Sequence, residues 1–207
     1  QASYKPPYRS FLLPVAEMRE DEELLLERFH RSWRRTLRKA LKHPLEVTVD
    51  TSNERLAELK EIYEHMKQRK GFVGLDLEVF ERTQALLPET KKIHNVTVWE
   101  DGYPLTIHSS NFLGKIGEGI AAGTNEKGLN YNSSYVAWWR TFRLAASCGM
   151  DYYDLGGVDE IKNPEGYHFK KRMGGTYIEH IGTFDIATNS LKQTLFHTIE
   201  HIAQGRK

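Results

Sequence analysis

Hydrophobic and polar positions follow two periods along the first half of the chain. Alternation with a period of two predicts strands, and apolar side chains at helical spacing predict helices. In chain order they indicate a strand, a long helix, a strand and two further helices, over residues 8–15, 20–42, 45–49, 54–69 and 77–87. Asn53 and Asp76 are suitable N-caps for the last two helices, and Pro88 ends the second of them.

The helix predicted over residues 20–42 has two contrasting faces. Its apolar side chains share one arc, and cations fill the opposite arc: Arg31, Arg34, Arg35, Arg38, Lys39 and Lys42. Acidic residues at its start and basic residues at its end suit the helix dipole. Such a basic face is either a solvated surface or a contact for phosphates of tRNA or of a cell-wall precursor diphosphate.

The second half of the chain begins as a meander of strands. Three strands are predicted over residues 93–100, 103–112 and 117–123, with Asp101-Gly102 as a hairpin turn. A polar loop, a Trp-bearing helix, a strand, a short helix, a strand and a last helix follow, over residues 128–132, 133–147, 152–155, 164–172, 176–186 and from 190. This order predicts an α/β (α+β) protein with a mixed, mostly antiparallel sheet flanked by helices, similar to the GNAT acyltransferase fold.

Composition narrows the class of protein. A chain of 207 residues with 39% hydrophobic and 28% charged residues is expected to form one domain over residues 1–207. Its single cysteine excludes an internal disulfide and a multi-Cys metal site. With no apolar run near the length of a membrane span and no signal-peptide pattern, a cytoplasmic protein without a transmembrane segment is expected. The net charge of +1 means that nucleic-acid binding would depend on local clusters of cations.

One long run of residues is more specific than the element order. From Asn132 the chain reads NSSYVAWWRTFRLAASCGMDYYDLGGVDEIKNPEGYHFKKRMGG, which contains Y-D-L-G-G and F-K-K-x-x-G-G. This run resembles the signature of the FemABX peptidyltransferase family, of the lipid II:glycine glycyltransferase type. The basic run from Arg34 to Lys42 resembles the helix that starts that family's second domain. Family members carry two GNAT-like domains, so this chain is expected to be the C-terminal-type domain, with the family's N-terminal domain absent or removed.

The resemblance implies an aminoacyltransferase that moves an amino acid from aminoacyl-tRNA onto a peptidoglycan precursor, either lipid II or UDP-MurNAc-pentapeptide. It implies no cofactor. Lys170 would stabilise the oxyanion, with Phe169 and Asp154 shaping the catalytic site. Further substrate contacts are expected from a set of residues around the motif and on the basic helix: Tyr153, Gly156, Gly157, Asn132, Ser134, Lys171, Arg34 and Arg38. The plainer interpretation of Lys170 is a solvated surface lysine, and that of the two glycines is an ordinary turn after a strand.

Two other functions remain open at this point. The first is an N-acyltransferase of the same fold that uses acyl-coenzyme A or an acyl carrier. Residues 128–134 (GLNYNSS) lack the Q/R-x-x-G-x-G/A pattern that cradles a pyrophosphate, which disfavours coenzyme A. The second is a non-catalytic half-domain that binds RNA or a partner. No metal site is predicted, because His197 and His201 stand four apart with no third ligand in the pattern.

Overall fold

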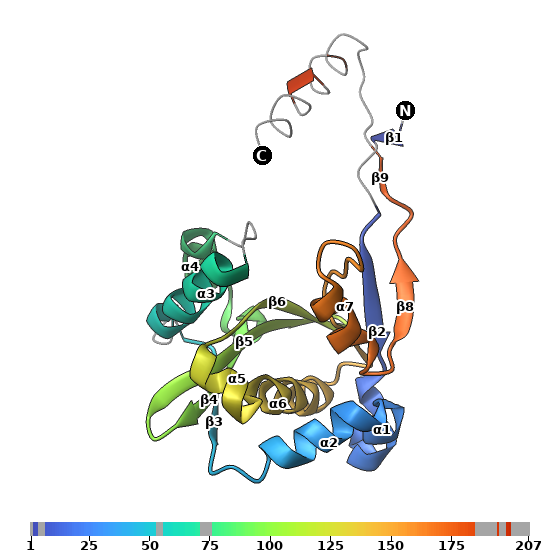
Figure 1. The fold of residues 1–207 in the computed structure, drawn as a ribbon. Helices are drawn as coiled ribbons and strands as arrows, with labels where there is room; N and C mark the ends of the chain where they lie inside the picture. Colours follow the sequence, from blue (N-terminus) through green and yellow to red (C-terminus); the bar gives the residue numbers. More distant parts are fainter. Residues whose placement is uncertain are drawn as a thin grey trace. The chain divides into compact units, whose positions relative to one another are not determined.

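The computed structural model describes residues 2–3, 7–52, 56–70, 76–184, 194 and 198–199 (Figure 1). The chain splits into two compact units, residues 1–8 with 179–207 and residues 9–178. In the smaller unit, strands β1 (Ala2–Ser3) and β9 (Thr183–Phe184) pair antiparallel. The predicted cap Asn53 and almost all of the helix predicted from residue 190 lie outside the described residues.

The larger unit is built on a seven-stranded sheet in the order β3-β4-β5-β6-β7-β2-β8. The strands in chain order are β2 (Arg9–Leu13), β3 (Glu46–Asp50), β4 (His94–Glu100), β5 (Tyr103–Leu113), β6 (Ile116–Thr124), β7 (Tyr152–Asp154) and β8 (Thr176–Glu179). Strands β3 to β6 pair antiparallel, β6 pairs parallel with β7, and β7 pairs antiparallel with β2. This mixed, mostly antiparallel sheet confirms the predicted fold class and the predicted meander, which lies beside the strand that begins at Tyr152.

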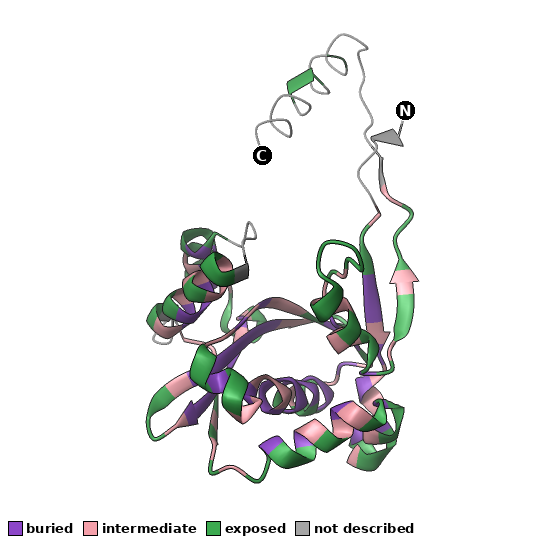
Figure 2. Cartoon of the chain, viewed as in Figure 1, coloured by how far each residue is buried: buried purple, intermediate pink, exposed green. Residues whose placement is uncertain are grey.

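Helices cover both faces of this sheet. They are η1 (Val15–Arg19), α1 (Glu22–Arg28), α2 (Arg31–Ala40), α3 (Leu56–Lys70), α4 (Leu77–Leu86), η2 (Glu89–Lys91), α5 (Glu126–Tyr131), α6 (Ser133–Ser147) and α7 (Pro164–Lys171). Helix α6 packs on β4 and β5 and is itself covered by α2, while α3 and α4 lie on the opposite face (Figure 1). Figure 2 shows α6 buried along much of its length and α2 exposed on its outer side.

Strand β6 contains a β-bulge that changes the direction of its side chains. Ser110 pairs with Gly119 and Ser109 pairs with Ala121, so Ile120 is an extra residue on β6. Without the bulge, Gly119 and Ala121 would point to the same face of the sheet. With it, Ala121 packs in the cluster under α3, whereas a β-carbon on Gly119 would point toward His108, on the α6 side.

The single helix predicted over residues 20–42 is wrong, because it is two helices. Phe29 and His30 are extended, with ψ of 138° and 143°, and separate α1 from α2. The His30 amide donates to the carbonyl oxygen of Arg172 at 2.7 Å, and its ring accepts from the Ser32 amide to cap α2. This long-range bond has no local signal. The predicted apolar face is still buried on both sides of the break, because Phe29 and Trp33 are each buried.

The polar loop predicted over residues 128–132 is also wrong, because helix α5 occupies most of it. Asn125 caps α5 by accepting from the Gly128 amide, and Asn132 has a left-handed φ of 54° that separates α5 from α6. Ser133 is the first residue of α6 rather than its cap. Its buried hydroxyl lies 2.6 Å from Oγ1 of Thr106 and donates to the carbonyl oxygen of Gly128 at 3.0 Å. The side chain therefore holds α5, α6 and β5 together.

The strand predicted over residues 176–186 is divided in the same way. Strand β8 ends at Glu179 and β9 begins at Thr183, with Gly182 at a φ of +100° between them. Only glycine adopts that backbone conformation without strain, so the extended run is interrupted there.

Aromatic rings make up most of the core between the sheet, α2 and α6. The Phe29 ring lies 4.6 Å from the Trp33 ring and 6.1 Å from the Phe142 ring, and Phe142 lies 5.5 Å from Tyr153 on β7. All four side chains are at most 1% exposed. Burial of this size stabilises by about 3–5 kcal/mol per large aromatic when judged by truncation to alanine. The core therefore fixes α2 and α6 against the strand that leads to the candidate site.

Gly174 offers a test of how the chain after α7 is seated. A β-carbon at Gly174 would lie 2.1 Å from the carbonyl oxygen of Arg28, and its φ is +72°. Gly174→Ala should lower the free energy of unfolding by about 3 kcal/mol or more, from backbone strain plus the clash. Gly114→Ala is the matched control, since φ is +66° with nothing within 4 Å, and should cost about 1–2 kcal/mol. Urea denaturation measures both, and equal losses would contradict the packing at Gly174.

Candidate functional site

The candidate site lies where β6 and β7 separate. Their parallel pairing joins Ile116–Glu118 to Tyr152–Asp154 and stops there, whereas β6 continues to Thr124. Ligand sites in sheets of this kind gather beyond the carboxyl ends of parallel strands. A cavity of about 580 Å³ lies beside this gap, and its walls come from α3, β6, α7 and the loop before α7. The side chain of Lys170 lines it.

A short helix and a glycine turn hold Lys170 in place. Asn163 caps α7 by accepting from the Gly166 amide, and Lys170 lies in the last turn of that helix. Its ammonium donates to the carbonyl oxygen of Gly157 at 3.0 Å. A β-carbon on Gly156 would lie 3.4 Å from this ammonium, and φ of Gly156 is +80°. Glycine at this position therefore allows both the turn and the close approach of the lysine.

Asp154 shapes the turn that Lys170 contacts. Its carboxylate accepts from the hydroxyl of Ser10 and from the Gly156 amide, the second at 2.8 Å. The Ser10 hydroxyl also lies 3.0 Å from the carbonyl oxygen of Gly156. Asp154 therefore caps the turn that follows β7 through a direct hydrogen bond. Its negative charge still acts on Lys170, because it opposes the lowering of the lysine pKa.

Burial changes the ionisation of Lys170. Removal from water lowers the pKa of its side chain to about 8, and the charge of Asp154 limits that change. The lysine is therefore mostly protonated at neutral pH and loses its proton under mildly alkaline conditions. An ammonium in this setting can donate to an oxygen that becomes negative, which is what oxyanion stabilisation requires.

A buried polar layer lies beneath the gap, on the α6 side of the sheet. The hydroxyl of Tyr153 lies 2.7 Å from Oγ of Ser110, and burial raises the pKa of the tyrosine. His108 lies beside it, with Nδ1 3.0 Å from Oγ1 of Thr141 and its ring 4.1 Å from that of Trp138. Sequence reasoning did not select His108 or Ser110, because each occupies an ordinary strand position with no motif around it.

Phe169 and Lys171 differ from Lys170 in what they contact. The half-buried Phe169 ring lies 5.1 Å from Tyr135 and 6.0 Å from Trp33, and so anchors α7 on α6 and α2. Lys171 is exposed, with its ammonium 5.3 Å from the centre of the Tyr167 ring. Of the two lysines in α7, only Lys170 lines the cavity.

The basic face of α2 adjoins the end of α7. The hydrogen bond from His30 to the carbonyl of Arg172 joins the start of one helix to the end of the other. Arg38 is exposed and Arg34 partly exposed. Within the described residues, no acidic side chain forms an ion pair with the cations of this face, which are Arg31, Arg34, Arg35, Arg38, Lys39 and Lys42. This surface carries uncompensated positive charge.

Asn132 and Ser134 lie at the start of α6, beside the far ends of β5 and β6. Among the described residues no hydrogen bond or ring contact joins either of them to Lys170 or Asp154. The structure thus brings together Lys170, Asp154 and the glycine pair, and leaves the two polar residues of the α6 start outside this cluster.

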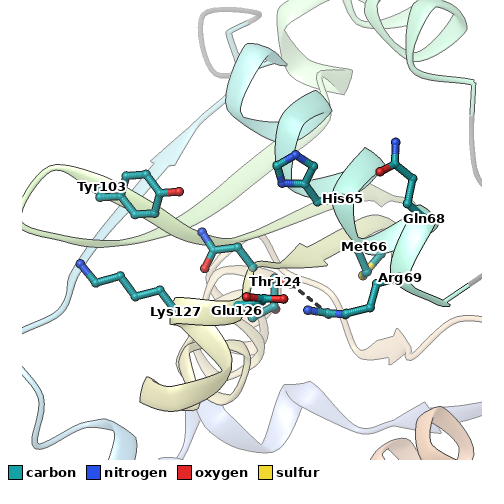
Figure 3. Close-up of a pocket in the computed structure, with 9 residues that line it drawn as sticks. His65, Met66, Gln68, Arg69, Tyr103, Thr124, Glu126 and Lys127 are labelled. Atoms are coloured by element: carbon teal, nitrogen blue, oxygen red, sulfur yellow. Dashed lines mark hydrogen bonds between the residues drawn. The ribbon is translucent and has the colours of Figure 1, made fainter.

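A second cavity, of about 920 Å³, was not expected from the sequence (Figure 3). It lies between the C-terminal part of α3 and the segment where β6 leads into α5, with Tyr103 at one side. Arg69 donates to the carbonyl oxygen of Thr124 at 3.4 Å across it. Met66 lines both this cavity and the one beside Lys170, so the two adjoin along β6. Its residues come from four separate elements, α3, β5, β6 and α5, which leaves no local pattern to detect.

The described residues contain neither a cluster of metal ligands nor a membrane-spanning helix. No three His, Cys, Asp or Glu side chains in that part of the chain are grouped as metal ligands. None of its helices combines the length and apolar character needed to cross a membrane.

The sheet, its gap and the helices around it define an α/β protein of the GNAT-like acyltransferase fold. An aminoglycoside acetyltransferase, meta-AAC0020, from an uncultured soil metagenomic sample shares this fold, with a TM-score of 0.52 and 13% identity over 70% of this chain and 97% of that one. The model of the FemAB family matches residues 105–201, so this segment of the chain is similar to that family. A comparison with curated proteins finds no match.

Solved structures extend the fold match beyond that segment. FemX superposes with a TM-score of 0.82 and 19% identity, over 95% of this chain and 65% of the FemX chain. The C-terminal domain of a putative lysylphosphatidylglycerol synthetase from Agrobacterium fabrum superposes with a TM-score of 0.59 and 11% identity, over 83% of this chain and 58% of that one. The chain therefore spans just under two thirds of FemX.

The lowered pKa of Lys170 predicts how stability depends on pH. Between about 8 and the ordinary lysine value near 10.4, the unfolded chain binds more protons than the folded chain, so folding gains stability as pH rises. Lys170→Met removes this dependence. Relative to the unmodified chain, the variant should be most favoured near pH 7, and its advantage should shrink as pH rises through that window. Thermal unfolding from pH 7 to 10.5 measures this, with exposed Lys171→Met as control. A constant difference across that range would contradict the burial of Lys170.

Proposed function

We propose that the chain is the catalytic GNAT-like domain of an aminoacyltransferase that moves an amino acid from aminoacyl-tRNA to an amine of a peptidoglycan precursor peptide. The acceptor is the peptide of lipid II or of UDP-MurNAc-pentapeptide, and the product is an interpeptide bridge. One observation carries this proposal: Lys170 lines a cavity at the gap between β6 and β7, inside the segment that matches the FemAB family. Because charged tRNA is cytoplasmic, the proposed reaction is cytoplasmic as well.

The proposed reaction requires the protein to orient the two reactants and to stabilise a developing negative charge. The acceptor amine attacks the ester carbonyl of the donor, a C–N bond forms, and the C–O bond to the ribose breaks. The proton lost by the amine passes to the departing ribose hydroxyl. An enzyme accelerates such a step by orienting the two reactants and by stabilising the oxyanion. Lys170 suits the second task, since its ammonium faces a cavity and is positioned through Gly157.

The surface of α2 suits the tRNA donor. Its cations have no acidic partners among the described residues, and His30, which caps the helix, binds the carbonyl oxygen of Arg172 at the end of α7. Phosphates of an acceptor stem that lies along α2 would therefore be close to the helix that carries Lys170. Arg34 and Arg38 belong to this surface, and Lys171 extends it on α7. These contacts would orient the RNA without reading its sequence.

The alternative donor, acyl-coenzyme A, is less well supported by the start of α6. In this structure Ser133 is buried and bonded to Thr106 and Gly128, so the first residue of α6 packs against α5 and β5. A β-carbon on Gly128 would lie 2.6 Å from the carbonyl oxygen of Leu105, which shows how tightly α5 is packed there. The Ser133 hydroxyl is therefore engaged within the protein rather than free to bind a pyrophosphate.

Replacement of Lys170 tests the catalytic assignment. Lys170→Ala in the natural full-length protein should slow the chemical step by about 10²–10³, the effect of losing one oxyanion donor. Lys171→Ala is the neighbouring control and should have a much smaller effect, because Lys171 does not line the cavity. Single-turnover transfer from aminoacyl-tRNA measures both. Equal losses would indicate a general role in holding RNA, and no loss at Lys170 would refute the assignment.

Replacement of the α2 cations tests the RNA contact. Arg31, Arg34, Arg35 and Arg38 changed together to Gln should leave folding intact, since the buried residues of α2 are Trp33, Leu37 and Ala40. Binding of tRNA should weaken and its salt dependence should flatten, by roughly 0.9 in log–log slope for each duplex phosphate that the protein no longer neutralises. Binding measured between low and high salt checks this. Identical curves for the variant and the unmodified protein would mean that the face is only solvated.

A further inference from the structure

Strand β6 has a backbone edge that is left uncovered beyond the end of β7. Its parallel pairing with β7 ends at Glu118, whereas β6 continues to Thr124. In the part of the chain that the structure describes, no other strand pairs with β6 on this side. Unpaired N–H and C=O groups along a strand edge are a ready template for a further extended segment. The edge therefore offers a place for a ligand that can pair as a strand.

One hydrogen bond establishes which residues of β6 direct their backbone groups toward this edge. The Asn125 amide donates to the carbonyl oxygen of Leu105 on the β5 side at 3.1 Å, so the backbone of Asn125 faces β5. Along an antiparallel strand this direction alternates from residue to residue. The register is regular after the bulge, so Gly123 also faces β5, whereas Ala122 and Thr124 face the uncovered edge.

Arg69 supports this assignment and limits the length of the edge. Its guanidinium, which comes from α3, donates to the carbonyl oxygen of Thr124 at 3.4 Å, so this carbonyl is directed away from β5. At Ala122, two residues earlier, no hydrogen bond from the described residues reaches the edge-facing N–H or C=O. Ala122 therefore presents one donor and one acceptor side by side, as an edge strand does to a new partner strand.

The cavity that Lys170 lines extends along this edge. Ile120 and Ala122 of β6 line it as well, and its volume is about 580 Å³. Met66 lines both this cavity and the larger one of about 920 Å³, which Thr124 lines further along the strand (Figure 3). The edge at Ala122 and the side chain of Lys170 therefore border the same space.

The walls of this cavity suit a neutral, extended ligand. Its charged side chains are Lys162, Glu165 and Lys170, and the carboxylate among them reduces the positive charge that would attract a phosphate. Tyr63 and Met66 on α3 add apolar surface. An extended peptide meets both conditions, because its backbone is neutral and its successive side chains point to opposite sides.

We propose that the edge of β6 at Ala122 binds an extended segment of the acceptor peptide as an added strand, in the place that β7 would occupy if its pairing continued. The N–H of Ala122 donates to a peptide carbonyl, and its C=O accepts from a peptide N–H. The inference rests on the proposed aminoacyl transfer and deepens it. Main-chain bonds of this kind hold a peptide whatever its side chains are, so the side chain that carries the acceptor amine is left to reach Lys170.

A scan of the peptide backbone tests this binding mode. The probe is the stem pentapeptide of UDP-MurNAc-pentapeptide, acetylated at its N-terminus and N-methylated at one amide at a time. Binding to the natural full-length protein should weaken about tenfold at the amide that donates to Ala122, as one lost hydrogen bond predicts, and stay near the parent value at the others. Equal losses at every amide, no loss at any, or no binding of the parent peptide would overturn the proposal.

Hydrogen exchange locates the peptide on the protein. With saturating peptide, exchange of the Ala122 amide should slow about tenfold or more, whereas the Gly123 amide, already bonded to β5, should change little. Coenzyme A is the second probe, because the amides of its pantetheine arm could form the same bonds. Protection of Ala122 by coenzyme A and not by the peptide, or by neither, would refute the peptide site.

A pair of substitutions at one position tests the donor itself. Ala122→Pro removes the edge-facing N–H and no bond to β5, and should weaken peptide binding about tenfold, whereas Ala122→Gly keeps the N–H and should bind as the unmodified protein does. Circular dichroism checks that both variants fold, and if the proline variant does not, the backbone scan decides. Equal affinity of two folded variants would contradict the added strand.

The failure of this inference differs from failure of the proposed function. Transfer of an amino acid from aminoacyl-tRNA to the precursor, with no response at Ala122, keeps the function and refutes the added strand. Peptide binding at Ala122 without any transfer keeps the strand site and refutes the function. Lys170→Met should bind the peptide with unchanged affinity and lose transfer, because the lysine acts on the reacting oxygen and not on the peptide backbone.

Discussion

The parallel contact between β6 and β7 lasts for three residues, and its early end determines where the rest of the site can lie. Beyond Glu118 and Asp154 the two strands no longer share hydrogen bonds, so the sheet opens toward α7 and α3. Asp154 then holds the chain in the turn at Gly156, and the carbonyl of Gly157 accepts from Lys170. If the two strands stayed paired for longer, the gap beside Gly119 would be closed by backbone. The placement of the lysine thus depends on the opening of the sheet.

A cation in this gap costs stability, and the aromatic core offsets that cost. Phe169 precedes Lys170 and packs with Tyr135 and Trp33, so the same turn of α7 has one side chain anchored and the next at the cavity. The bond between His30 and Arg172 adds a second attachment between α7 and α2. Because α7 has only eight residues, it would not remain ordered without such packing. Rigid support for one charged group is what electrostatic stabilisation of a reacting oxygen requires.

Much of the fold could be predicted from the sequence, because the signals for it are local. The meander, its Asp101-Gly102 turn and the helix capped by Asp76 depend on neighbouring residues, and each is present. The break at Phe29 and His30 could not be predicted, since it depends on a bond to Arg172 far along the chain. Helix α5 was missed because its polar sequence gives little hydrophobic periodicity.

The candidate site was predictable only in part, for the same reason. The motif around Lys170 places the lysine, Asp154 and two glycines close together in sequence, and they are close in space as well. The polar layer of His108, Ser110 and Thr141 comes from β5 and α6, and it is assembled only when the sheet forms. These three residues occupy regular strand and helix positions, so no sequence pattern indicates that they form a polar layer.

The bulge at Ile120 has a consequence for how this strand can change during evolution. A single extra residue reverses the faces of all β6 side chains after it, so Gly119 and Ala121 serve opposite sides of the sheet. Loss or gain of one residue between Gly119 and Thr124 would exchange those faces again and turn Ala121 toward α6. Substitutions in this stretch can be absorbed by repacking, but a change of length cannot. Homologous chains that keep the same gap should therefore align across β6 without insertions or deletions, and tolerate them in the surface turns at either end.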